Sequence, residues 1–366
     1  MRYIGNKTRL IPFILEAVQR LVPRPGIACG PFAGTASVSQ ALKGAGWAVH
    51  SGDLMAFSYA LQVARVELDR IPDFSRAILA ELEGGEGLRG GGSAYARLLE
   101  RLERLPSSHG FITENYSPAG ESGARFGRMY FTQRNAGAID AVRERITDWM
   151  KAGRLDRRQS QLLIATLVEA ADRVANTTGV YASFVKSWQP NARKRLELRP
   201  LGPTGRRNGG RRCTAFLGEA IDRVSSAGTI DLLYLDPPYN ERQYPAYYHL
   251  PELIASGWDP PPQLRGKTGL IPDGSLRSDW CRRDRCEAAL TELLAGADAR
   301  HILLSYNDEG LLESDRIEAI FREAGDPDTY RRLNRRYRRY RSDGDGPDRT
   351  YARDRVREQL HYVRRA

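Results

Sequence analysis

Short apolar runs that end at turn residues recur along this chain, and they predict buried parallel strands. The clearest is Ile230–Leu235, and similar runs lie at Ile27–Cys29, Trp47–Ser51 and His301–Tyr306. Helical patterns lie between them, including the amphipathic segment from Leu10 to Leu21 and a helix that begins near Ser37. Alternation of strand and helix is typical of an α/β fold, so we expect an open, mainly parallel sheet with helices on both faces.

The stretch from Phe74 to Arg212 has a different pattern, which is helical throughout. Asn135–Met150 and Asp156–Val174 show helical periodicity, and the positions expected to be packed are Leu162, Leu163, Ala165, Thr166 and Val168. Gly84 to Gly92 reads as a glycine-rich surface loop. The sequence therefore predicts two parts, a catalytic domain of residues 1–73 and 213–366 and an inserted helical region of residues 74–212.

Composition favours a nucleic-acid partner. The 366 residues include 56 Lys and Arg against 45 Asp and Glu, which gives a formal net charge of +11. Such a field attracts phosphates and makes binding depend on salt. Scattered arginines are also compatible with an ordinary solvated surface. Two denser runs stand above that background: Arg331, Arg332, Arg335, Arg336, Arg338, Arg339 and Arg341, interleaved with Tyr330, Tyr337 and Tyr340, and a looser run from Arg193 to Arg212. We expect a strand-rich face beside nucleic acid for the first and a mobile connection for the second.

No stretch of eighteen apolar residues occurs, and the amino terminus lacks a signal-peptide pattern. We therefore expect a soluble, cytoplasmic protein with no membrane partner. The cysteines, Cys29, Cys213, Cys281 and Cys286, do not have the spacing of a zinc site, so we expect structural thiols and no metal.

The tetrapeptide Asp236, Pro237, Pro238, Tyr239 carries the clearest chemistry. It follows the run Ile230–Leu235, so the Asp236 carboxylate lies at the carboxyl end of a strand, where open α/β sheets bind ligands. Prolines donate no backbone N–H, which leaves nearby carbonyls available as acceptors in a stiff loop. A carboxylate, the Pro237 carbonyl and the Tyr239 ring suit a planar group that bears an NH2. An alternative is a strand-ending turn without chemistry.

A second candidate site lies near the amino terminus. Its turn follows the run Ile27–Cys29 and precedes a helix, and it consists of Pro31, Phe32, Ala33, Gly34 and Thr35. A glycine turn before a helix lets backbone N–H groups approach a ligand, although a plain turn has the same pattern. Asp53 ends the second strand, with Leu54 beside it. An acid there bonds ribose hydroxyls in nucleotide-binding units, or else it caps the following helix.

Asp-Pro-Pro-Tyr resembles the catalytic motif of S-adenosylmethionine-dependent amino methyltransferases. The stretch Arg2–Lys7 is similar to the aromatic, glycine and lysine element that precedes the cofactor strand in the alpha group of DNA adenine methyltransferases of bacterial restriction-modification type. Carried over residue by residue, the resemblance puts Tyr3 and Lys7 at the cofactor. It also makes Glu219, in Phe216–Ala220, the acid that faces the cofactor adenine. The implied fold is the Rossmann-like sheet of class I methyltransferases.

The resemblance extends through most of the chain. Similar segments are Met129–Thr132 with Asn135 and Asp140, Asn176–Tyr181 with Lys186, Gly266–Leu270, Leu303–Asn307 and Glu358–Leu360. Two positions of the cofactor turn depart from the family pattern. Gly30 stands where an acid is usual, and Ala36 stands where a second glycine is usual. We expect an active enzyme whose cofactor affinity is reduced.

The resemblance implies transfer of a methyl group to the N6 amine of an adenine that is flipped out of duplex DNA. The order of the motifs makes residues 74–212 the candidate recognition region, and the segment from Asp259 to Cys281 is a second candidate DNA contact. A cognate restriction endonuclease encoded nearby and association with the nucleoid are further expectations. Alternatives are an RNA base-amine methyltransferase, a protein-glutamine methyltransferase, which normally carries Asn at the place of Asp236, and a degenerate DNA-binding relative.

Overall fold

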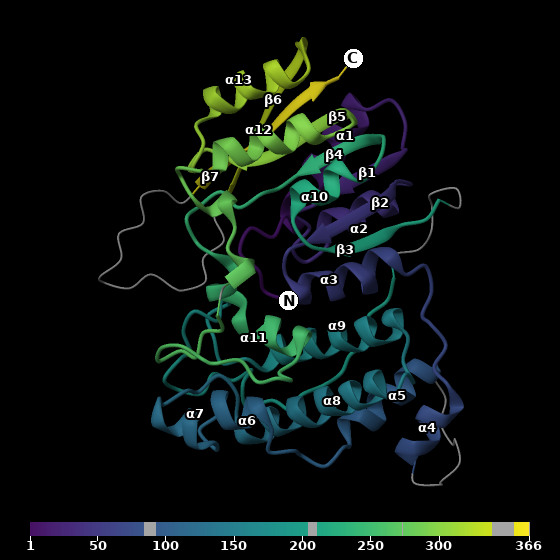
Figure 1. Cartoon of the computed structure of the whole chain (residues 1–366), viewed down its shortest axis with the longest axis vertical. Coiled ribbons are helices and arrows are strands. Elements are labelled where there is room, and N and C mark those ends of the chain that lie inside the picture. Colours follow the sequence, from purple (N-terminus) through teal and green to yellow (C-terminus); the bar gives the residue numbers. More distant parts are fainter. Residues whose placement is uncertain (84–92, 204–210, 273, 339–354, 366) are drawn as a thin grey trace. The chain divides into compact units, whose positions relative to one another are not determined.

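The computed structural model describes residues 1–83, 93–203, 211–272, 274–338 and 355–365 (Figure 1). Its contacts divide the chain into two compact units. The helical unit comprises Met1–Ile4, Val63–Pro203 and Tyr244–Gly274. The sheet unit comprises Gly5–Gln62, Thr204–Gln243 and Ser275–Ala366.

In the described residues of the sheet unit, seven strands form one sheet in the order β3-β2-β1-β4-β5-β7-β6 (Figure 1). The five strands from β3 to β5 in this order run parallel to one another, whereas β7 is antiparallel to both β5 and β6. The strands are β1 (Ile27–Gly30), β2 (Ala48–Asp53), β3 (Thr214–Leu217), β4 (Ile230–Leu235), β5 (Ala299–Asn307), β6 (Asp326–Arg338) and β7 (Arg355–Arg364). This arrangement is a mixed α/β fold of the class I methyltransferase type.

Apolar side chains of the helices cover this sheet. Residues of β4 and β5 share a core with α10, α12 and α13, while α1 packs on α2, and α3 lies along β2 and β3. The helical segments of the unit are η1 (Thr8–Leu10), α1 (Ile11–Leu21), α2 (Ser37–Gly44), α3 (Ala56–Gln62), α10 (Ala220–Ser225), η4 (Asp279–Cys281), α12 (Cys286–Gly296) and α13 (Ser314–Ala324).

The strand order brings two predicted motifs to one place. β1 and β4 are neighbours in register, with Cys29 beside Leu233, and the order of the chain reverses between them. Ligands of open α/β sheets bind at such a switch point, outside the carboxyl ends of the strands. The turn after β1 and the Asp-Pro-Pro-Tyr segment after β4 therefore flank the expected binding crevice.

The helical unit is built around two long helices that pack on each other, α8 (Gln133–Lys151) and α9 (Arg157–Val174). Thr132 caps α8, and Asp156 forms a capping box with Gln159 at the start of α9. The other helical segments of the unit are η2 (Val63–Glu67), α4 (Arg76–Glu83), α5 (Ala94–Glu103), α6 (Phe111–Tyr116), α7 (Glu121–Arg125) and α11 (Tyr244–Ser256), and η3 (Gly274–Leu276) begins at its last residue.

Buried polar residues brace this unit, and several come from segments that the sequence singled out. The Asp140 carboxylate accepts backbone N–H groups of Gly110, Ile112 and Thr113 at 2.8–3.1 Å. The Asn135 amide donates to the carbonyls of Ala192 and Lys194. These side chains satisfy loop backbone that would otherwise be buried without partners.

The predicted elements are confirmed closely. β4 has the predicted bounds, α8 and α9 occupy the two predicted helical segments, and the five positions expected in the core of α9 are buried. All four cysteines are buried and free. The Arg331–Arg338 run lies on β6, so this part of the run forms a strand as expected. Other predicted features lie outside the described residues, namely Arg339, Arg341, Arg206, Arg207 and the loop 84–92.

The compact units divide the chain at positions other than the predicted domain boundaries. The helical unit extends from residue 63 rather than 74, and it also includes residues 244–274, which follow Asp-Pro-Pro-Tyr in the sequence. That the unit recognises DNA stays a prediction. Among the described residues no helix is long and apolar enough to cross a bilayer.

Candidate active site

The Asp-Pro-Pro-Tyr segment begins immediately after β4, as expected. The Asp236 side chain is 16% exposed, and its Oδ1 lies 3.2 Å from the Nζ of Lys7. In the described part of the chain, no donor reaches the carbonyl of Pro237. The Asp236 carboxyl group and the Pro237 carbonyl, which no described donor reaches, thus follow one another at the carboxyl end of β4.

The Tyr239 ring is held at the edge of this group. It contacts Tyr306 of β5 edge-on at a centroid distance of 6.5 Å, and Lys7 Nζ lies 5.7 Å from its centre. The Tyr239 carbonyl accepts the N–H of Leu311. Because both its ring and its backbone are fixed, Tyr239 can offer a flat face to a planar ligand.

Lys7 is the centre of a buried ion cluster. Its side chain is 3% exposed, and its Nζ lies 2.6 Å from Oε1 of Glu358, which is fully buried on β7. Ser305 of β5 donates its hydroxyl to the same Glu358 oxygen. One ammonium therefore contacts two carboxylates, and Lys7 is placed beside the predicted catalytic residue.

Burial and these charges set the ionisation of the cluster. Burial raises the pKa of Asp236 to about 7, Lys7 acts to lower it, and Glu358 acts to raise it. Burial alone would lower the pKa of Lys7, but the two carboxylates outweigh it and raise that pKa well above its usual range. At neutral pH Lys7 is charged, and the Asp236 carboxyl can gain or lose a proton.

Polar side chains hold the turn after β1 in place through hydrogen bonds to its backbone. Gly34 has φ 50°, its N–H donates to Oδ2 of Asp53 at 2.8 Å, and its carbonyl accepts from Ser58 and Gln62 of α3. Oδ1 of Asp53 accepts the N–H of Met55. Asp53 thus supports the turn and the start of α3, which was the alternative to ribose binding. Its contact with a ribose stays a prediction.

The neighbours of this turn are also fixed. The N–H of Ala33 donates to the carbonyl of Gly52 on β2, and the Phe32 ring packs edge-on against Trp280 at 4.8 Å. Asn6 donates its side-chain amide to the Thr35 hydroxyl at 3.0 Å. The Asn6-Lys7 pair therefore connects the glycine turn to Asp236 within the sheet unit.

Tyr3 lies in the helical unit. Its ring stacks on Tyr248 at 4.8 Å and contacts Tyr244 at 5.5 Å, and the next N–H, of Ile4, donates to the Tyr248 hydroxyl. The chain passes from one unit to the other between Ile4 and Gly5. The expectation that Tyr3 contacts a cofactor stays a prediction.

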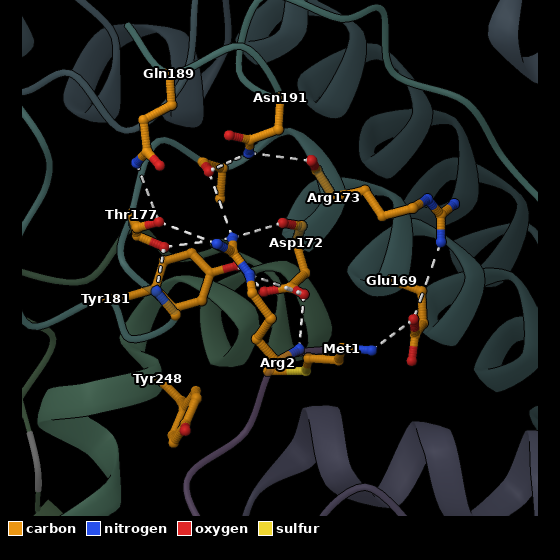
Figure 2. Close-up of polar contacts among 12 residues, drawn as sticks. Met1, Arg2, Glu169, Asp172, Arg173, Thr177, Tyr181, Gln189, Asn191 and Tyr248 are labelled. Carbon is orange, nitrogen blue, oxygen red and sulfur yellow. Dashed lines mark hydrogen bonds and ion pairs between the residues drawn. The ribbon is translucent and has the colours of Figure 1, made fainter. Parts of the chain in front are cut away.

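Arg2 anchors the same end of the chain on the last turn of α9 and the segment that follows it (Figure 2). Its guanidinium donates to the carbonyls of Asp172 and Thr177, and its N–H donates to Asp172 Oδ2 at 2.8 Å. Tyr181 donates its hydroxyl to the other Asp172 oxygen. The Asn176–Tyr181 segment, which the sequence singled out, thus receives the amino-terminal segment.

The end of β3 presents two side chains to solvent. Leu217 is 51% exposed, an unusual value for a large apolar residue in this structure. Glu219 is exposed two residues later, at the start of α10. Burial and the nearby acids Asp222 and Asp279 raise the pKa of Glu219. An apolar surface beside a carboxylate fits a purine ring that has an amine or a hydroxyl group next to it, because the carboxylate can accept a hydrogen bond from that group.

The two departures from the family pattern differ in their structural effect. Ala36 has φ 67°, in the left-handed region that favours glycine. Gly30 ends β1, and a Cβ added there would lie 3.6 Å from Ser39 Oγ, which is ordinary contact. Ala36 is therefore strained, whereas the space at Gly30 would accept a side chain.

Sequence reasoning assigned no role to Glu358 or Ser305, although both lie in segments that it noted. A glutamate just before the apolar positions Leu360, Tyr362 and Val363 was the available signal. Within the described residues, no group of three or more His, Cys, Asp or Glu could hold a metal ion. The expectation of a metal-free site stays a prediction.

Comparison with known proteins agrees with the site. The chain matches the family of D12 class N6 adenine-specific DNA methyltransferases over residues 3–320. It is 35% identical to the type II methyltransferase M.FokI of Planomicrobium okeanokoites over 343 residues, 93% of this chain and 50% of that protein. It is 33% identical to M.NlaIII of Neisseria lactamica over 346 residues, 94% of this chain and 93% of that protein.

A third relative is the modification methylase StsI of Streptococcus sanguinis, 30% identical over 88% of this chain and 46% of that protein. The chain thus spans about half the length of M.FokI and of the StsI enzyme, and nearly all of M.NlaIII. The family match covers the glycine turn, the ion cluster's Lys7 and Asp236, and the Tyr239 ring. This chain belongs to the D12 class of N6 adenine-specific DNA methyltransferases.

Proposed function

We propose that this protein methylates the N6 amine of adenine at a specific site in duplex DNA, with Asp236 as the catalytic residue. The position of Asp236 carries the proposal. Its carboxylate lies at the carboxyl end of β4, beside the switch point of the sheet, with Lys7 Nζ at 3.2 Å. The free Pro237 carbonyl supplies the second acceptor.

These groups match the needs of an aromatic amine. Such an amine is a weak nucleophile because its lone pair is conjugated with the ring. When Asp236 and the Pro237 carbonyl accept its two hydrogens, the nitrogen becomes pyramidal and its lone pair becomes available. The new N–C bond forms as the methyl bond to sulfur breaks, and the amine must then lose one proton. A carboxylate with a pKa of about 7 can take that proton.

S-Adenosylmethionine, when bound, supplies the methyl group. The residues proposed to hold it fit its parts. The turn Pro31–Thr35 leads into α2, whose first backbone N–H groups can donate to a ligand, and the Asp53 carboxylate holds that turn through the N–H of Gly34. Leu217 and Glu219 suit the adenine end. Lys7 is included because its ammonium contacts Asp236. Leu54 and Tyr3 are the remaining residues that we propose to contact the cofactor.

The adenine must leave the duplex to reach such a site, at an unstacking cost of a few kcal/mol. Tyr239 is proposed to recover part of that cost by stacking on the flipped base, since base–aromatic stacking is worth about 1–3 kcal/mol. The basic surface supplies phosphate contacts that hold the remaining duplex.

We propose that the helical unit recognises the DNA sequence, in part through the loop Arg265–Leu270. Arg128 is 2% exposed, no described carboxylate pairs with it, and its guanidinium donates to the carbonyls of Asn115, Gly266 and Lys267. Tyr116 donates to the Gly269 carbonyl. These buried donors fix the loop backbone, so the exposed Lys267 and Arg265 are presented in a defined shape.

Two further proposals concern context. A protein that modifies DNA for a restriction-modification system would act in the cytoplasm, on the nucleoid. A cognate restriction endonuclease is the expected partner, because two relatives are named type II methyltransferases and a third a modification methylase.

The test is transfer of tritiated methyl groups from S-adenosylmethionine to unmethylated bacterial DNA, with ribosomal RNA assayed beside it. Wild-type protein should form N6-methyladenine in DNA. Asp236→Ala should lose transfer by at least a thousandfold while still binding S-adenosylmethionine in calorimetry. Full activity of Asp236→Ala would refute the catalytic assignment, and label in RNA alone would refute the DNA substrate.

A further inference from the structure

The sequence alone assigns Glu358 no role in methyl transfer, but the position of its side chain in the fold is unusual. Its side chain is fully buried on β7, and its Oε1 lies 2.6 Å from Lys7 Nζ. Ser305 donates to the same oxygen, while no described atom hydrogen-bonds Oε2. A buried carboxylate is costly, and one with an unsatisfied oxygen is more so.

The stability of the fold does not account for this cost. Replacement of a buried ion pair by packed apolar residues is often neutral or stabilising. The neighbours of Glu358 in the same strand include Leu360, Tyr362 and Val363, which fill the core without charge. A role in the adjacent site gives a reason for the charge.

The elements around Glu358 show what it controls. Lys7 lies in the chain before η1 and carries a long, otherwise rotatable side chain. β7 is separated from β4 in the sheet by β5, which supplies Ser305. Glu358 therefore holds Lys7 from a rigid strand that is independent of the Asp-Pro-Pro-Tyr loop.

The distances show how the ammonium is shared. Lys7 Nζ lies 2.6 Å from Glu358 but 3.2 Å from Asp236. If Lys7 paired with Asp236 alone, its ammonium would occupy the carboxylate that the adenine amine must contact. A second, nearer carboxylate draws the ammonium back and weakens that competition.

We propose that Glu358 is a positioning residue for methyl transfer, which holds the Lys7 ammonium at a distance where the ammonium favours the ionised form of Asp236 yet leaves that carboxylate free to accept the adenine amine. This inference rests on the proposed function. The titratable groups that interact with Asp236 are Lys7, Glu358 and Tyr234, and Tyr239 interacts with Lys7. Burial and Asp236 raise the pKa of Tyr234 well above its usual range, so both carboxylates and one ammonium are the charges that count near neutral pH.

The test is the pH dependence of kcat in Glu358→Gln, Glu358→Asp and wild type. Since Glu358 acts to raise the pKa of Asp236, loss of its charge should move the acidic limb of the profile about 1 pH unit lower. The plateau kcat should fall about tenfold, because Lys7 then pairs with Asp236 alone. Glu358→Asp keeps the charge and should retain the wild-type limb.

Ser305→Ala is the matched control, because it removes a hydrogen bond of Glu358 without a change of charge, and its limb should stay in place. A second readout needs no catalysis. Infrared difference spectra of wild type against Asp236→Asn report the pH at which the Asp236 carboxyl protonates, and Glu358→Gln should lower that pH.

An unchanged limb and an unchanged infrared titration in Glu358→Gln would overturn the proposal. So would a uniform loss of activity at every pH with a lower Tm, which a purely structural role predicts. Failure of the proposed function is distinguishable, because it would show as an active Asp236→Ala variant.

Discussion

Removal of the Lys7 ammonium should make methyl transfer require a higher pH. In Lys7→Gln the Asp236 and Glu358 carboxylates stay buried together with no cation between them. In the proposed mechanism the active form of Asp236 is the carboxylate, and Lys7 acts to lower the pKa of that group. Without Lys7 the pKa of Asp236 rises, so the acidic limb of the kcat profile should move to higher pH.

The separation of the pair gives the magnitude. Two unit charges 3.2 Å apart interact by about 5 kcal/mol at an effective dielectric constant of about 20. Partial exposure of Asp236 reduces that value, and measured effects of one opposite charge are about 1–3 pH units. We therefore expect a move of about 2 pH units, with kcat reduced roughly 100-fold at pH values below the wild-type limb and restored above the limb of the variant.

The assay is single-turnover methyl transfer from pH 6 to 10, with circular dichroism as a check of folding. Since the position of the limb does not depend on the amount of folded enzyme, partial instability does not obscure it. Lys151→Gln is the matched control, because it removes the same charge from an exposed pair with Asp259. A Lys7→Gln profile with the wild-type limb would refute the electrostatic role of Lys7.

Three further predictions follow from local geometry. Gly30→Asp should lower the Kd for S-adenosylmethionine about tenfold in calorimetry, because the space there admits a side chain and an acid can bond the methionine amino group; an unchanged or weaker Kd would contradict this. Asp140→Ala should reduce the free energy of unfolding by about 2–4 kcal/mol in denaturant titrations, because three loop N–H groups lose their acceptor, and Asp140→Asn should lose less. Arg128→Met should weaken DNA binding in a salt titration and leave cofactor binding intact, whereas equal loss of both would argue against a DNA-contacting loop.

Much of the fold was predictable because its signals are local. The run Ile230–Leu235 is apolar on both faces apart from Asp231 and is bounded by a turn, so its strand has the predicted limits. The α9 pattern begins at an aspartate cap with glutamine three residues later, and the helix begins there. The role of Asp53 was less predictable, because an acid at the end of a strand has the same pattern whether it bonds a ribose or the backbone of Gly34.

The division of the chain into units could not be read from periodicity. Residues 244–274 follow Asp-Pro-Pro-Tyr in the sequence, yet α11 packs on α9 in the helical unit. Helical patterns specify an apolar face but do not specify which partner covers it. The predicted boundaries at residues 74 and 212 therefore differ from those of the compact units.

The sequence by itself determined the strands β1, β2, β4 and β5, the glycine turn and the acid at the end of β4, because hydrophobic period and turn residues act over a few positions. Only the tertiary structure decided that Lys7 and Glu358, 351 residues apart, form one buried cluster with Asp236. That meeting depends on β7 pairing with β5 and on the path of the amino-terminal segment to the end of β4. Ion pairs between distant residues follow from the order of strands in a sheet, which no local pattern in the chain specifies.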